Sequence, residues 1–197
     1  MSGTPGNMAA TLQTALARHQ AGDLDGAAEL YEAVLRAEPG QFDALHLFGI
    51  LHGQSGRLAG AADLLAAAVR ARPNHAGARF NLGTTLRRLQ RPAEALDHLD
   101  KAIALEPAMA EAHFGRANAL YDVGRLAEAL AAYDRTIALK PDHPDALFRR
   151  AIVLQALGRT TEALEGVERV LRLNGARIDA LRLRGVLLDA LGRPQEA

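Results

Sequence analysis

Cysteine is absent from the 197 residues, so this chain can form neither a disulfide framework nor a thiolate site for a metal or for redox chemistry. Tryptophan is also absent, and aromatic residues make up only 4% of the chain. The 23 Lys and Arg residues balance the 23 Asp and Glu residues. A chain of zero net charge lacks the broad positive field that draws a protein to nucleic acid or to an anionic membrane. Neither is expected as a partner.

Long apolar runs are missing too. No stretch approaches 18 apolar residues, so no membrane span is expected. Residues 1–7 lack the basic and apolar regions of a secretory signal, and they are expected to form a flexible leader. We therefore expect a cytoplasmic protein. Lys occurs only twice against 21 Arg, a bias that indicates a GC-rich genome and a bacterial source.

Alanine and leucine dominate what is present. The chain contains 41 Ala and 32 Leu, together more than a third of its residues. Both residues have high helix propensity, whereas residues that favour strands are scarce. The composition predicts an all-α protein.

The sequence repeats itself every 34 residues. The prolines Pro39, Pro73, Pro107 and Pro141 follow this step. So do the glycines Gly22, Gly56, Gly124, Gly158 and Gly192, with Gln90 as the exception in the series. Arginine follows that slot from Arg57 onwards, and an alanine series runs from Ala27 to Ala197. Several series that share one period indicate a repeat architecture.

Taking Met8 as the first position divides the chain into five full repeats and a partial sixth. Their bounds are 8–41, 42–75, 76–109, 110–143, 144–177 and 178–197. Each repeat is expected to form two helices. In the fourth, these are 110–123 and 126–139, separated by Gly124 and closed by Pro141. Small residues in the eighth position, such as Gly49 and Gly83, are expected to let the two helices approach closely.

These features resemble the tetratricopeptide repeat family. The resemblance rests on the 34-residue period, on the recurrence of a small residue, Gly, Ala, an aromatic residue and Pro at fixed positions, and on blocks such as 124–130. The resemblance implies a right-handed α-solenoid of antiparallel helix hairpins, with the first helix of each repeat lining a concave groove. The chain departs from the family in the fourth and seventh positions. The fourth position, Trp or another large residue in the family, is here Thr11, Leu45, Arg79, His113, Leu147 and Leu181. The seventh position changes from Thr14, Phe48 and Leu82 to Arg116, Arg150 and Arg184 in the last three full or partial repeats.

The resemblance also implies that the second, fifth, ninth, twelfth and thirteenth positions of each repeat face the groove. Phenylalanine fills the fifth position in three consecutive repeats, where it is either partly buried between adjacent helices or an anchor for a bound peptide. The second reading predicts that Phe114→Ala weakens a partner without loss of helicity. The residues expected to bind a partner are Phe80, Phe114, Phe148, Arg87, Asn118, Tyr121, Arg149 and Gln155.

An acidic series occupies the second position, at Asp43, Glu111, Asp145 and Asp179. Acids near a helix start complement the helix dipole, and contact with a basic ligand is the alternative. Some family members grip a carboxylate terminus with Lys, Asn and Arg across three repeats. The windows here lack that set, so such a clamp is not expected.

No catalytic pattern stands out. No two of the seven histidines have the i, i+4 spacing of a helical metal site, and neither a phosphate-binding loop nor a nucleophile motif is present. No cofactor or metal is expected, and the chain is predicted not to be an enzyme. Catalytic residues are likewise expected to be absent.

The first functional hypothesis is a scaffold that binds a peptide or protein segment in the groove. The alternatives are a substrate-recruiting N-terminal arm of a larger glycosyltransferase-like or sulfotransferase-like enzyme, and a spacer or self-assembly module. Residues 178–197 are expected to leave an apolar helix uncovered, so they predict a homo-oligomer formed through the last repeat.

Overall fold

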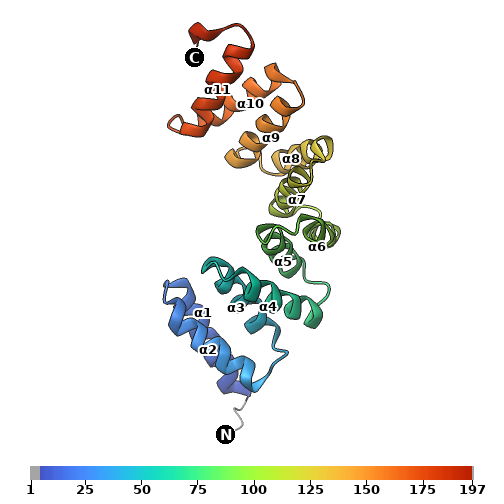
Figure 1. The fold of residues 1–197 in the computed structure, drawn as a ribbon. Coiled ribbons are helices and arrows are strands. Elements are labelled where there is room, and N and C mark those ends of the chain that lie inside the picture. The colour runs from blue at the N-terminus through green and yellow to red at the C-terminus, as the bar shows by residue number, and fades with distance from the viewer. Residues whose placement is uncertain (1–4, 197) are drawn as a thin grey trace. The chain divides into compact units, whose positions relative to one another are not determined.

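The computed structural model describes residues 5–196, and within them the chain is all-helical (Figure 1). The helices fall into two compact units, Met1–Leu105 and Glu106–Ala197. The first unit contains α1 (Pro5–Gln20), α2 (Leu24–Ala37), α3 (Phe42–Gln54), α4 (Leu58–Ala71), α5 (Ala76–Arg88) and α6 (Pro92–Leu105). The second contains α7 (Ala110–Asp122), α8 (Leu126–Leu139), α9 (Pro144–Ala156), α10 (Thr160–Leu173), α11 (Ile178–Ala190) and a 3₁₀ turn, Pro194–Glu196.

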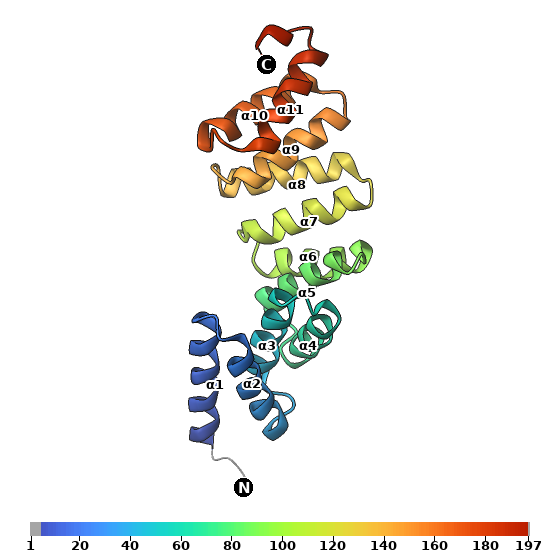
Figure 2. The same cartoon turned by 60° about the vertical axis from the view of Figure 1, so that its left-hand side comes forward.

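The helix starts confirm the predicted period. Within each unit, consecutive helices pack as antiparallel hairpins (Figure 2). The first helices α3, α5, α7, α9 and α11 begin at the first residue of their predicted repeats. The predicted start at Met8 is the exception, because α1 already begins at Pro5. Residues 5–7 of the predicted leader are helical, with proline in the first turn, where its missing N–H costs little. Residues 1–4 lie outside the described residues.

The glycine series ends the first helices through positive φ angles. Gly22, Gly56, Gly124, Gly158 and Gly192 have φ between 71° and 84°, and Gln90 adopts φ 60° in the same slot. At Gly56 the next residue, Arg57, donates its N–H to His52 O at 2.9 Å, which closes a Schellman turn. The same bond joins Arg91 N–H to Leu86 O at 3.0 Å. The turn therefore has the same backbone whether glycine or glutamine occupies it.

The arginine series marks the start of the second helices. Arg91 pairs with Glu94 through two hydrogen bonds of 2.7 Å, and Arg125, Arg159 and Arg193 pair in the same way with the glutamate three residues on. These pairs are half exposed, so each adds little to stability. They hold the arginine side chain against the start of the second helix in three repeats and against the 3₁₀ turn after Arg193.

Small residues set the spacing within each hairpin, as predicted. Ala27 and its repeat equivalents Ala61, Ala95, Ala129 and Ala163 are fully buried. A Cβ built on Gly83 would lie 2.8 Å from Leu99 Cγ and 3.1 Å from Ala95 O, and one on Gly49 would lie 2.7 Å from Leu65 Cγ. A methyl group at either position would require the facing leucine to shift, and at Gly83 it would also crowd the backbone oxygen of Ala95.

Buried aromatic residues also lie in the core of the hairpins. Tyr31 is fully buried at 0% exposure, its ring lies 5.9 Å from that of Phe48, and burial raises its pKa to about 12. Its equivalent in the second unit, Tyr133, donates its hydroxyl to Asn118 Oδ1 at 2.7 Å.

Among residues 5–196, no helix has both the length and the apolar character needed to cross a lipid bilayer.

Candidate functional site

The first helices of the first unit share one face. α1 contacts α3, and α3 contacts α5. Between α3 and α5 lies a hollow of about 170 Å³. Its lining residues are Gly49, Ile50, Gly53, Gln54, Leu65, Asn81, Thr84, Thr85 and Arg88. The ninth and thirteenth positions of both repeats are among them, so these groove positions do face a common space.

Polar groups line this hollow. Arg88 Nη1 donates to Gly53 O at 2.9 Å, and the Asn81 amide contacts His46 Nε2 at 2.9 Å. The Thr84 hydroxyl is buried and has no hydrogen-bond partner among the described residues. Gly53 leaves room, because a Cβ there would meet no atom closer than 3.9 Å. The hollow therefore offers donors and an open floor to a bound group.

Two of the predicted partner-binding residues belong to α5. Phe80 and Arg87 are both half-buried on this helix. Neither of them lines the hollow, whereas Thr84, which sequence reasoning passed over, does. The signal was present, since Thr84 occupies the ninth position of its repeat.

The remaining predicted residues lie in the second unit, on α7 and α9. Phe114 and Tyr121 are half-buried on α7, whereas Asn118 is 9% exposed and is held by Tyr133. The Asn118 side chain therefore supports the hairpin core. On α9, Arg149 is exposed and Gln155 is half-buried.

The phenylalanines lie against the start of the next first helix. The ring of Phe114 is 4.8 Å from that of His143, and the guanidinium of Arg177 lies 4.5 Å above the ring of Phe148. Phe148 is only 9% exposed as a result. Partial burial between adjacent helices, one of the two readings open from the sequence, describes both residues.

His143 and Arg177 share a position that sequence reasoning missed. Both are N-cap residues at the end of a repeat, as are Gln41 and His75. His143 Nδ1 accepts a hydrogen bond from Ala146 N–H at 3.2 Å, which leaves its ring face free to stack. Since histidine is an uncommon N-cap, the 34-residue series alone gave no hint of this role.

The first unit repeats this arrangement with histidines. His46, in the fifth position of its repeat, lies 5.3 Å from the ring of His75, whose Nδ1 accepts from Ala78 N–H at 3.0 Å. Burial lowers the pKa of His46 and nearby His75 lowers it further, while Asp43 opposes the shift. The neutral form of the His46 imidazole is therefore favoured.

The acidic series is paired within the chain. Asp145 and Asp179 both bind Arg177, at 2.8 and 2.9 Å, and Glu111 pairs with Lys140. Asp43 lies 3.7 Å from Arg72. The hydrogen bond from Lys140 holds the pKa of Glu111 below its usual value. These carboxylates stabilise junctions between helices.

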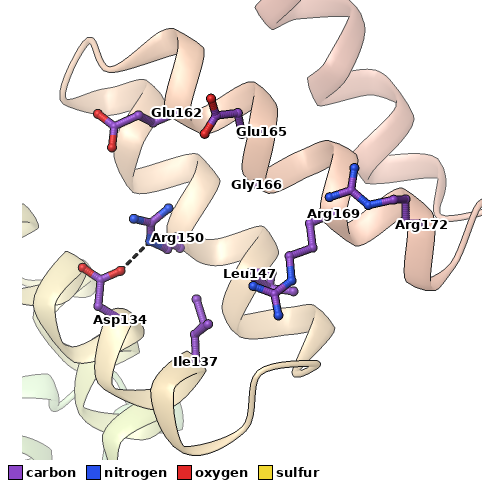
Figure 3. A pocket seen from close by; sticks show the side chains of 9 residues that line it. All are labelled: Asp134, Ile137, Leu147, Arg150, Glu162, Glu165, Gly166, Arg169 and Arg172. Carbon is purple, nitrogen blue, oxygen red and sulfur yellow. Dashed lines mark hydrogen bonds and ion pairs between the residues drawn. The ribbon is translucent and has the colours of Figure 1, made fainter.

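A second hollow, of about 380 Å³, opens between α8, α9 and α10 (Figure 3). Arg150 reaches from α9 to Asp134 on α8 at 2.5 Å, and Gly166 forms part of the wall. At this hollow, Arg150 stands where Phe48 and Leu82 stand in earlier repeats, and Gly166 stands where Leu30 and Leu64 stand. Three arginines and three carboxylates line it, so it carries no net charge to select a ligand.

No group of three or more His, Asp or Glu side chains that could hold a metal occurs in the described part of the chain. His75 and His143 cap helices, and His19 contacts Gln54 at 2.8 Å.

A family model for the tetratricopeptide repeat matches residues 2–42, 46–110, 83–144, 114–176 and 148–197. The chain belongs to the tetratricopeptide repeat family. This confirms the predicted fold class, an α-solenoid of five full repeats and a partial sixth. No curated protein sequence matches the chain.

Solved structures share the fold. A structure of YrrB, described as a TPR protein with an unusual peptide-binding site, is 24% identical, covers 87% of this chain and 89% of its own, and has a TM-score of 0.76. A structure of MamA is 26% identical over 82% and 95% of the two chains, with a TM-score of 0.75. PilW, a type IV pilus biogenesis factor, is 23% identical over 95% and 87%, with a TM-score of 0.85.

Proposed function

We propose that this chain is a non-enzymatic, cytoplasmic bacterial scaffold that binds a peptide or protein segment along the faces of its first helices. The observation that carries the proposal is the hollow between α3 and α5. It joins the ninth and thirteenth positions of two neighbouring repeats and is lined by the polar side chains of Gln54, Asn81 and Arg88.

The hollow suits one side chain of an extended segment. Its volume of about 170 Å³ is too small for a drug-sized ligand, whose pockets measure roughly 300–1,000 Å³. The Arg88 guanidinium, which lines the hollow, can donate to a carbonyl or carboxylate oxygen of the segment.

Support also comes from the family and from one structural relative. YrrB is described as having a peptide-binding site, and it shares this fold. In the second unit, Tyr121 and Arg149 are accessible on α7 and α9, and side chains of these types are common anchors in interfaces.

The test begins with a peptide library displayed on phage and selected on the chain of residues 1–197. A selected peptide is then titrated by fluorescence anisotropy against two hollow variants, Arg88→Ala and Gly53→Ala. Arg88→Ala removes a donor, and Gly53→Ala adds a methyl group to the floor without a clash. We expect each to weaken binding by about tenfold, the effect of losing one good contact.

Arg135→Ala is the matched control, because Arg135 is an exposed arginine on the second helix α8. It should leave the affinity unchanged. Equal affinities for the wild type and for both hollow variants would show that the peptide binds elsewhere and would overturn the proposal.

A further inference from the structure

The hollow between α8, α9 and α10 measures about 380 Å³, against about 170 Å³ for the hollow between α3 and α5. All three of its helices belong to the second unit, and α11 follows them in the chain. Ile137 and Leu147 are the apolar side chains that line it, and Leu147 is 4% exposed. The hollow therefore combines an apolar lining with room for a side chain from outside.

Gly166 leaves this room. Leucine fills the equivalent position in two earlier repeats, at Leu30 and Leu64. A Cβ built on Gly166 would lie 3.4 Å from Ala151 Cβ, which is an ordinary contact, so the backbone does not require glycine at this point. The glycine leaves open a space that a leucine side chain would fill.

Six charged side chains line the hollow, and four of them are engaged within the chain. Arg150 pairs with Asp134, Glu162 binds Arg159, and Arg169 donates to Pro141 O at 2.5 Å. The remaining two, Glu165 and Arg172, are exposed and have no hydrogen-bond or ion-pair partner among residues 5–196. Figure 3 shows Glu165 in the first half of α10 and Arg172 towards its end. The hollow thus offers one unpaired charge of each sign.

The spacing of these two charges indicates the conformation of a partner. Glu165 and Arg172 are seven residues apart on one helix, so their Cα atoms lie about 10 Å apart along its axis. Two residues seven apart on a partner helix match this distance, whereas residues on one face of a strand are about 7 or 14 Å apart. A helix alongside α10 can therefore meet both charges at once.

We propose that this hollow docks one amphipathic helix of a partner protein, which lies antiparallel to α10. An acidic residue of that helix pairs with Arg172, and a basic residue seven positions later pairs with Glu165. An apolar residue between them, three or four positions after the acid, enters the hollow over Leu147 and Gly166. Acid before base is the order that the helix dipole favours, so charge and direction agree. This site is separate from the hollow between α3 and α5.

A phage-displayed library of alanine-based helical peptides tests the proposal. Positions i, i+3, i+4 and i+7 of the peptide are randomised, and the library is selected on the chain of residues 1–197 after depletion on Gly166→Leu. That variant fills the hollow but leaves the hollow between α3 and α5 intact, so peptides that bind the first helices are removed. We expect the remaining peptides to carry an acid at i, an apolar residue at i+3 or i+4 and a base at i+7.

Fluorescence anisotropy of a selected peptide then measures single contacts. Gly166→Leu should weaken binding by about tenfold or more, because its side chain takes the place of the apolar residue. Arg172→Glu should weaken binding by about fivefold, and a peptide with Lys in place of the acid at i should recover the affinity. Arg135→Glu is the control, because it makes the same charge change at an exposed site on α8 outside the hollow. It should leave the affinity unchanged.

Circular dichroism should show the wild-type helix content for Gly166→Leu, since leucine occupies this position in two other repeats. The charge restoration does not depend on that variant, so it decides the matter even if Gly166→Leu loses helix. A library that yields no peptide after depletion, or peptides that bind Arg172→Glu as tightly as the wild type, would overturn the proposal. A dimer of the free chain that Gly166→Leu abolishes in sedimentation would also overturn it, because a second copy would then be the occupant. None of these results bears on peptide binding by the first helices.

Discussion

Gln90 holds a backbone conformation that its side chain disfavours. Its φ of 60° occurs in the slot that glycine fills in the other repeats, and its side chain is exposed. The left-handed region costs a non-glycine residue roughly 1–2 kcal/mol, part of which glycine returns through its greater freedom in the unfolded chain.

Gln90→Gly should therefore raise the free energy of unfolding by about 1 kcal/mol, measured by urea denaturation. Gln90→Ala is the control, because it removes the same side chain without relieving the backbone. Stability that is unchanged in the glycine variant would mean that this turn is not strained.

Buried histidines make stability depend on pH. Burial lowers the pKa of His46, His52 and His98 in the folded protein. Between their unfolded pKa of about 6.5 and their lower folded values, the unfolded chain binds more protons. Stability should therefore fall as the pH drops from about 7 to about 5. In this window the glutamates are still ionised in both states.

Chemical denaturation at a series of pH values measures this slope. His46→Gln should flatten it, because one of the groups that gains a proton on unfolding is then absent. A free energy of unfolding that stays constant between pH 7 and pH 5 would contradict the account.

The effect of adding a methyl group at a helical glycine depends on which atoms face that glycine inside the hairpin. At Gly83 a methyl group would meet Leu99 and the backbone of Ala95, at 2.8 and 3.1 Å. At Gly166 the nearest atom, Ala151 Cβ, is 3.4 Å away, which is an ordinary contact. Both glycines lie inside helices, where alanine is intrinsically preferred.

Gly83→Ala should lower the free energy of unfolding by about 1–3 kcal/mol through overpacking, while Gly166→Ala should be neutral or slightly stabilising. Thermal and urea unfolding of the two variants side by side check this. A loss of equal size in both would show that helix spacing does not depend on the small residue at Gly83.

The 34-residue period of the sequence is most informative about the positions of the helices. It predicted where α3, α5, α7, α9 and α11 begin, because proline and glycine act locally on the backbone. It could not predict that His143 stacks on Phe114, since that contact joins two repeats through side-chain rotamers. For the same reason the ion pairs of the acidic series were missed.

At the scale of the whole molecule, the residues predicted to bind a partner are divided between the two units. Phe80 and Arg87 belong to the first unit with the hollow, and the other six predicted residues belong to the second. Repeat proteins use the exposed face of stacked helices for binding, while the core between neighbours supplies the stability. Phe148 belongs to that core more than to the face, since Arg177 covers it.

Phe148→Ala should therefore destabilise the fold by about 3–5 kcal/mol, whereas Tyr121→Ala should cost much less and mainly weaken a bound partner. Paired unfolding and anisotropy measurements separate the two effects. An unchanged unfolding midpoint in Phe148→Ala would return that residue to the list of partner anchors.

The central claim is that a segment of another protein binds on the first helices. The most direct measurement is mapping of backbone amide shifts by NMR on titration of a peptide selected against the chain. The account predicts that the shifts concentrate in α3 and α5 around Gly53, Thr84 and Arg88. Shifts confined to the second helices α2, α4 and α6 would contradict it.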